Sequence, residues 1–126
     1  MLAIFELLAM GRVLYIDIDC HHGDGVEQAF YLSNRVLTLS LHRYGPGYFP
    51  GTGSLESRGE GKGFGYCCNV PLEAGIGDRQ YQELFRPIAQ AARDAFSPAA
   101  IVLQCGADAL ARDPLGIYLS DWPYIC

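Results

Sequence analysis

Acidic and histidine side chains recur at alternate positions in one short segment, residues 17–21, which contains Asp17, Asp19 and His21. Residues two apart in an extended chain point to the same side, so these three side chains are expected to face together. A further acid, Asp108, follows an apolar run much later in the sequence. Two carboxylates and one imidazole form the ligand set of a catalytic zinc ion, which keeps a coordination position open. The pattern therefore predicts a metal site at Asp19, His21 and Asp108.

The same residues also permit structural interpretations. A D-x-H pattern is short, and a single Asp after a strand often closes a turn, as Asp108 could. Asp24 and Glu27 have the spacing of a helix capping box, so Asp24 could be a cap rather than a catalytic residue. His22 would point away from His21 in an extended segment, and we expect it to be structural.

Four apolar runs predict the strands that position these side chains, at residues 13–16, 36–41, 66–72 and 99–105. Helical patterns alternate with the strands, at residues 2–10, 26–32 and 78–96. This alternation predicts an α/β fold with an open, mostly parallel sheet and flanking helices. Ligands collect at the C-terminal ends of parallel strands, where the polar residues of this sequence occur.

The connections carry two further signals. Residues 44–65 are rich in glycine and predict a long loop, and long loops inside compact domains are often functional. In residues 78–96 the apolar positions follow the i, i+3, i+4, i+7 spacing of an amphipathic helix. We expect Asp78 to cap this helix and Pro87 to kink it.

The composition excludes several function classes. The sequence has 9 basic and 14 acidic residues, a formal net charge of −5, and its basic residues form no cluster, so direct nucleic-acid binding is not expected. No stretch approaches the ~18 consecutive apolar residues of a membrane span, so no membrane partner is expected either. Residues 1–10 lack the basic start of a signal peptide. Five cysteines, none in a C-x-x-C pair, favour a reducing compartment over a disulfide framework.

Three separate motifs resemble those of one known family. Residues 12–27 read RVLYIDIDCHHGDGVE and resemble the metal-binding segment of class I histone deacetylases. Residues 48–53 (YFPGTG) resemble the channel loop of these enzymes, and residues 102–108 (VLQCGAD) resemble the segment of their third metal ligand. The resemblance is collinear from about Leu2 to Ser120, and it assigns residues 1–120 to the domain. It implies an arginase/deacetylase-like domain truncated at both ends, followed by a divergent tail at residues 121–126.

The resemblance assigns roles to individual side chains. It implies that Zn²⁺ is held by Asp19, His21 and Asp108. It also implies that Asp17 and Asp24 orient the two catalytic histidines of the family. Phe49 and Leu115 would line the narrow channel for the acyl-lysine stem, whose methylene chain suits apolar walls.

Members of this family also hold structural monovalent cations, so the resemblance implies two possible K⁺ sites. The positions that match the first are Asp17, Asp19, His21, Ser40 and Leu41. The positions that match the second are Phe30, Ser33, Val36 and Tyr66.

The implied function is zinc-dependent hydrolysis of N6-acetyl-lysine in histone tails or other proteins. That activity would place the protein in the nucleus, the cytoplasm or both, as a chromatin regulator that represses transcription. Some class I enzymes bind an inositol phosphate through an Arg where this chain has Pro114, so that ligand is not expected here. Residues 45–49 also favour the class I branch that works without a co-repressor complex.

The chain departs from the family pattern in two places. The catalytic histidine pair of the family lies upstream of the matching segment, and its glycine-rich loop with the oxyanion-stabilising Tyr lies downstream. These 126 residues contain neither motif, so we expect the chain alone to have no useful deacetylase activity.

Three alternative functions stay open at the level of sequence. The chain could be a non-catalytic product that binds partners, or it could belong to an acetylpolyamine or other small-amide deacetylase. A ureohydrolase of the same fold is disfavoured because its second metal needs an acid at the position of Leu110.

Overall fold

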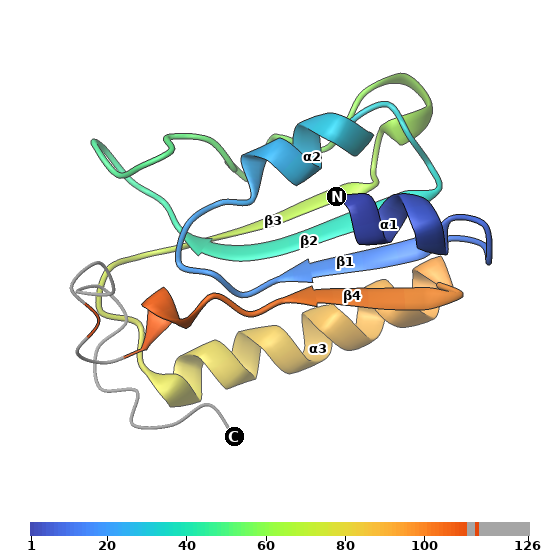
Figure 1. Ribbon diagram of the computed structural model, residues 1–126. Coiled ribbons are helices and arrows are strands. Elements are labelled where there is room, and N and C mark those ends of the chain that lie inside the picture. The colour runs from blue at the N-terminus through green and yellow to red at the C-terminus, as the bar shows by residue number, and fades with distance from the viewer. Residues whose placement is uncertain (111–112, 114–126) are drawn as a thin grey trace.

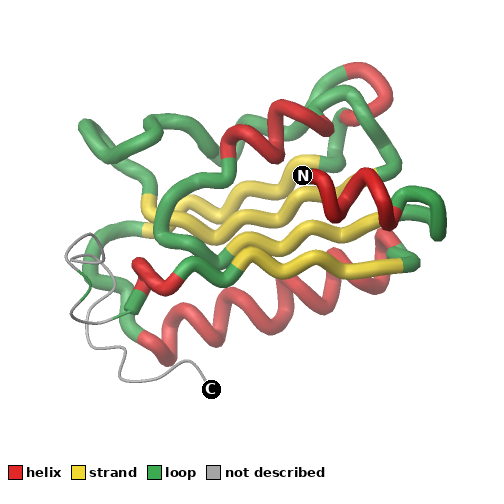
Figure 2. The backbone as a smooth tube through the Cα atoms, in the orientation of Figure 1, coloured by secondary structure: helices red, strands yellow, loops and turns green. Residues whose placement is uncertain are grey.

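The computed structural model describes residues 1–110 and residue 113 (Figures 1 and 2). A four-stranded sheet in the order β3-β2-β1-β4 forms its centre, and each pair of neighbouring strands is parallel. The strands are β1 (Val13–Asp17), β2 (Val36–Arg43), β3 (Cys67–Leu72) and β4 (Ala100–Gln104). The helices are α1 (Leu2–Leu7), α2 (Asp24–Phe30) and α3 (Asp78–Phe96), with short 3-10 turns η1 (Gly61–Gly63) and η2 (Ala107–Ala109). The predicted α/β class with a parallel sheet is confirmed.

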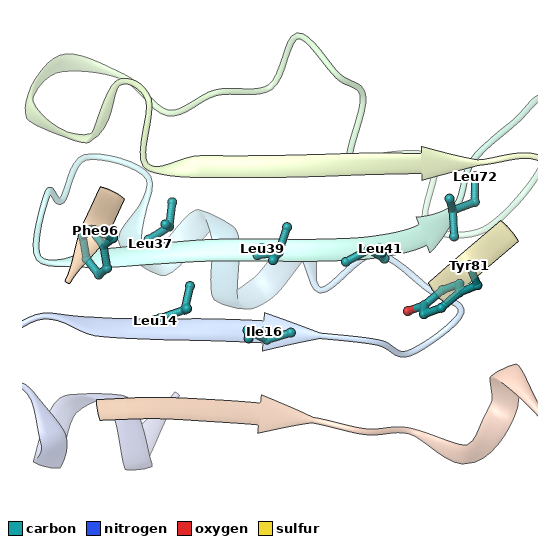
Figure 3. Close-up of a cluster of buried hydrophobic side chains, with 8 residues drawn as sticks. All are labelled: Leu14, Ile16, Leu37, Leu39, Leu41, Leu72, Tyr81 and Phe96. Carbon is teal, nitrogen blue, oxygen red and sulfur yellow. The ribbon is translucent and has the colours of Figure 1, made fainter. Parts of the chain in front are cut away.

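Helices cover both faces of the sheet. Figure 1 shows α1 and α2 over one face and α3 along the other. The face toward α3 is apolar because alternate residues of β1 and β2 point to it. This core consists of Leu14, Ile16, Leu37, Leu39, Leu41, Leu72, Tyr81 and Phe96. Figure 3 shows the leucines in rows along the strands, with Phe96 and Tyr81 at opposite ends.

The opposite face changes character along the strands. Near their N-terminal ends an apolar cluster packs beneath α1 and α2, and it contains Ile4, Val13, Tyr15, Phe30 and Val36. Toward their C-terminal ends the buried side chains are polar instead: Asp17, Ser40, His42 and Asn69. Buried polar groups require hydrogen-bond partners, so this end of the sheet is built to hold a polar arrangement.

The helix starts differ from the sequence-based expectations. The N-cap of α2 is Gly23, and Asp24 is already helical, so the predicted cap at Asp24 is wrong. The N-cap of α3 is Gly77 rather than Asp78, and the Gly77 amide donates to the Gln80 side chain over 3.1 Å. Pro87 does not end α3, which continues to Phe96.

Strand β4 has only one strand neighbour among the described residues. Its alternate residues Ile101 and Leu103 are 50% and 53% exposed, whereas the strands β1 and β2 are buried. In the described part of the chain, none of the helices combines the length and apolar character needed to cross a bilayer.

Candidate metal centre

The segment after β1 leaves the sheet through two consecutive turns. The Asp17 Oδ1 atom accepts a hydrogen bond from the Asp19 amide over 3.0 Å, and Asp19 Oδ1 accepts one from the His21 amide over 2.8 Å. An Asp carboxylate that accepts from the amide two residues later stabilises a turn. The extended geometry thus ends at Asp17, and turns, not strand alternation, bring Asp19 and His21 together. The Nδ1 atom of His21 lies 3.2 Å from Asp19 Oδ1.

Asp108 reaches the same place from the other end of the described chain. Strands β1 and β4 pair with Asp17 opposite Gln104, so the segments that follow them emerge side by side (Figure 1). The Cys20 amide donates to Asp108 Oδ1 over 3.1 Å, and Asp108 Oδ2 lies 2.7 Å from His21 Nδ1. Two carboxylates therefore meet at one imidazole nitrogen.

Gln104 and a glycine hold the Asp19 carboxylate in place. The Gln104 side-chain amide donates to Asp19 Oδ2 over 3.0 Å, and the amide of Gly106 donates back to Gln104 Oε1 over 2.5 Å. A Cβ atom at Gly106 would lie 2.1 Å from Asp19 Oδ2, so any larger residue there would displace the Asp19 carboxylate. The close packing fixes the direction in which Asp19 presents its other oxygen.

The chemistry of this cluster fits a divalent metal ion. The ligand atoms of Asp19, Cys20, His21 and Asp108 all lie within 4.8 Å of one another. The side chains of Asp19, His21 and Asp108 keep about a fifth of their surface exposed (20%, 25% and 18%), which leaves access from solvent. Burial raises the pKa of Asp108, but hydrogen bonds from Cys20 and His21 outweigh burial and lower the pKa below its usual value.

Cys20 is the member of the cluster that the sequence analysis missed. Its Sγ atom lies 3.3 Å from His21 Nδ1 and 3.2 Å from the Tyr48 hydroxyl. Burial raises the pKa of the thiol to about 12. A thiol binds metal as its thiolate, so Cys20 is a weaker candidate ligand than the carboxylates. In the sequence, only its position between Asp19 and His21 points to membership of this cluster.

Two aromatic residues from the loop after β2 flank His21. The Tyr48 ring stacks on the imidazole with a centroid distance of 5.4 Å and an interplanar angle of 5°. The Arg43 guanidinium lies 4.5 Å from the Tyr48 ring centroid. Phe49 meets His21 edge-on at 6.0 Å and is 75% exposed, so its ring stands at the rim of the cluster.

Comparison with known proteins decides the family. A model of the histone deacetylase domain matches residues 1–121. The chain belongs to the histone deacetylase family. Histone deacetylase 2 of Oryza sativa subsp. japonica is 56% identical over 118 residues, and human histone deacetylase 1 is 55% identical over 118 residues. The alignments cover 93% of this chain but 23% and 24% of those proteins, so the chain spans about a quarter of the length of the curated relatives it matches.

The two acids expected to orient catalytic histidines border one open hollow of about 450 Å³. Asp17 is 1% exposed and accepts a hydrogen bond from the Tyr15 hydroxyl over 2.6 Å. Burial raises the pKa of Asp17. The Asp24 carboxylate accepts from the Gly25 amide over 2.7 Å. Gln104 lines the same hollow and contacts Asp19, so the hollow adjoins the metal cluster.

The remaining positions singled out from the sequence fall into three groups. Ser40 and Leu41 are buried on β2, beside the end of β1, where Ser40 pairs with Asp17. The second set of expected cation positions lies at the end of α2, at the start of β2 and just before β3. Its residues are Phe30, Ser33, Val36 and Tyr66. Leu115, Pro114 and residues 121–126 lie outside the described residues.

A network of buried polar side chains adjoins the candidate metal ligands. The sequence analysis did not predict that these side chains contact one another. His22 contacts Thr52 over 2.8 Å and Glu27 over 3.1 Å, so it lies outside the metal cluster, in keeping with the structural role predicted for it. His42 lies between Ser40 Oγ and the Gly53 carbonyl, at 2.9 and 2.8 Å. Burial lowers the pKa of His42 to about 4, so its ring is neutral near pH 7.

Proposed function

We propose that this chain supplies the zinc-binding segments of a lysine deacetylase site. The observation that carries the proposal is the meeting of Asp108 Oδ2 and Asp19 Oδ1 at His21 Nδ1, at 2.7 and 3.2 Å. Family membership supports it, because the curated relatives are named histone deacetylases. The proposed reaction is hydrolysis of the acetyl-lysine amide in histone tails or other proteins.

Asp19, His21 and Asp108 would hold the metal, and Gln104 would orient Asp19. A zinc ion held by these residues supplies the Lewis acidity that makes an amide carbonyl susceptible to attack by water. Phe49, at the rim, would contact the apolar stem of the acyl-lysine. Leu115 would complete that wall.

Asp17 and Asp24 would orient the two catalytic histidines that the family resemblance implies. The hollow that both acids border is open to such side chains. Carboxylates that orient an imidazole fix its tautomer and raise its basicity, which suits a group that takes a proton from water.

We also propose the domain bounds, the cation sites and the location in the cell that follow from the family resemblance. The partial domain would comprise residues 1–120, with structural K⁺ at the two sets of positions given above. Because acetyl-lysine occurs in histones and in other proteins, we place the protein in the nucleus, the cytoplasm or both. Because Pro114 carries no charge, an inositol phosphate ligand is not part of the proposal.

A segment exchange tests this function without relying on the isolated chain. The 118 aligned residues of human histone deacetylase 1 are replaced by those of this chain, and zinc content and hydrolysis of an acetyl-lysine peptide are measured. We expect the exchanged protein to bind zinc and to hydrolyse the peptide at a rate comparable with its parent. A folded exchange protein that binds zinc but does not hydrolyse the peptide would contradict the proposed activity.

A further inference from the structure

We propose that Glu27 is a positioning residue for the metal centre, because its buried carboxylate joins the loop that carries His21 to the loop that carries Tyr48. This inference rests on the proposed metal site. Glu27 itself touches neither Asp19, His21 nor Asp108, so its effect is exerted through the residues between them.

Glu27 accepts hydrogen bonds from three separate segments. Its Oε2 atom lies 3.1 Å from His22 Nε2 and accepts from the Asn69 side-chain amide over 2.7 Å. Its Oε1 atom accepts from the Ser57 hydroxyl over 2.7 Å. The donors come from the loop after β1, the loop after β2, and strand β3. A single carboxylate on α2 thereby connects all three.

The Glu27 carboxylate is buried and ionised. It therefore acts only as an acceptor in all of these hydrogen bonds. The Glu27 side chain is 8% exposed and that of His22 is 1% exposed. Burial raises the pKa of Glu27, but the hydrogen bonds from His22, Asn69 and Ser57 outweigh burial and lower the pKa. An ionised carboxylate only accepts hydrogen bonds, so His22 Nε2 must carry the hydrogen. The other ring nitrogen, Nδ1, lies 2.8 Å from the Thr52 hydroxyl.

This network holds both sides of the stack at the metal centre. His22 follows His21 directly in the chain, so a fixed His22 ring fixes the backbone that presents His21. Thr52 lies shortly after Tyr48, whose ring stacks on His21 at 5.4 Å. The contacts from Glu27 to His22 and from His22 to Thr52 therefore restrain the His21 imidazole and the Tyr48 ring together.

The loop after β2 packs closely against the rings of His22 and His42 at Gly53. A Cβ atom at Gly53 would lie 2.3 Å from His42 Nε2 and 2.6 Å from His22 Cγ, and Gly53 has a φ of +88°. Only glycine allows this approach and this backbone conformation together. A buried charged group is often no more stabilising than an apolar group of similar volume, so we infer the role of Glu27 from the geometry that it fixes.

The test compares metal binding in matched variants of the chain. Glu27→Gln keeps the shape but removes the charge, so its oxygen accepts more weakly from His22 and Asn69, and its amide must donate to Ser57 instead of accepting from it. Thr52→Val removes the other side-chain hydrogen bond of His22. Leu37→Ala damages the apolar core on the opposite face of the sheet and controls for lost stability. Zn²⁺ affinity is measured by competition with a chromophoric chelator, and Co²⁺ absorption spectra report ligand geometry, at a temperature where every variant is folded by circular dichroism.

We expect Glu27→Gln to weaken Zn²⁺ binding about tenfold, the lower end of the range for groups behind a ligand, and to change the Co²⁺ spectrum. Thr52→Val should act in the same direction, and the two effects should be non-additive because both pass through His22. Leu37→Ala should leave the Co²⁺ spectrum unchanged at equal or greater loss of stability.

Two results separate this inference from the proposed function. If the unmodified chain binds no Zn²⁺ or Co²⁺, the metal site fails and the inference fails with it. If the unmodified chain binds both metals, but Glu27→Gln leaves affinity and spectrum unchanged or acts no differently from Leu37→Ala, then the positioning role is overturned while the metal site stands.

Discussion

The Nδ1 atom of His21 lies 2.7 Å from Oδ2 of Asp108, although 87 positions separate the two residues in the sequence. The parallel pairing of β1 with β4 creates this contact, since it sets Asp17 opposite Gln104 and lets the following segments meet. The contact joins an imidazole to a carboxylate at a partly exposed edge of the sheet, which is the arrangement that the proposed zinc site needs.

Replacing Asp108 with Ala should remove most of the bound zinc, because two protein ligands rarely hold this ion. Asp17→Asn and Asp24→Asn, at the adjoining hollow, should lower affinity or activity by about 10–100-fold at most, as is typical of residues behind the ligands. Elemental analysis of the purified variants gives the zinc content. Equal loss of zinc in all three variants would show that the ligands are assigned wrongly.

Replacing Gly106 with Ala should weaken zinc binding by displacing a carboxylate. The new Cβ atom would lie 2.1 Å from Asp19 Oδ2, and the backbone of Gly106, with a φ of −54°, suits alanine. The effect is therefore steric and local. Gly45→Ala is the matched control, because a Cβ atom there meets nothing within 4 Å. Zinc affinities by chelator competition should differ by about tenfold or more between the two variants, in line with loss of a group that orients a ligand.

Acidification should remove the stabilisation that Glu27 contributes. Burial raises the pKa of Glu27, yet its hydrogen bonds outweigh burial and lower the pKa below the usual value. A carboxyl with a lower pKa in the folded chain stabilises the fold above its unfolded pKa of about 4.3, and this contribution is lost as the pH falls through the lower folded pKa.

Urea unfolding of the metal-free chain and of Glu27→Gln measures this effect across pH. The difference in the free energy of unfolding should be constant above about pH 5 and should shrink below about pH 4. A difference that stays the same at every pH would contradict the ionised, hydrogen-bonded state of Glu27.

The elements of this fold were predictable from local patterns, whereas the polar network was not. The apolar runs located all four strands, and the polar residues at their ends led to Asp19, His21 and Asp108. Glu27 was misread because its spacing from Asp24 is a local capping pattern, while its partners Ser57 and Asn69 are 30 and 42 residues away. The parallel register of β2 and β3 sets Asn69 opposite Ser40, and Asn69 in turn donates to the Ser57 carbonyl over 3.1 Å.

Replacing Phe49 with Ala should weaken substrate binding and leave the stability of the fold nearly unchanged. The ring is 75% exposed, so its removal should change the free energy of unfolding by less than about 0.5 kcal/mol. In the protein with exchanged segments, KM for an acetyl-lysine peptide should rise while zinc content stays the same. A fall in zinc content with an unchanged KM would place Phe49 in the metal site and not along the acyl-lysine stem.

X-ray absorption at the zinc edge of the zinc-loaded chain tests the central claim most directly. Carboxylate and imidazole ligands from Asp19, His21 and Asp108 predict a first shell of nitrogen and oxygen at about 2.0–2.2 Å, with the scattering pattern of one imidazole. Cys20 stands close enough to compete, and a thiolate ligand would add sulfur at about 2.3 Å. A nitrogen and oxygen shell whose imidazole scattering is lost in His21→Ala supports the proposed ligands. A sulfur shell, or a spectrum unchanged in His21→Ala, would contradict them.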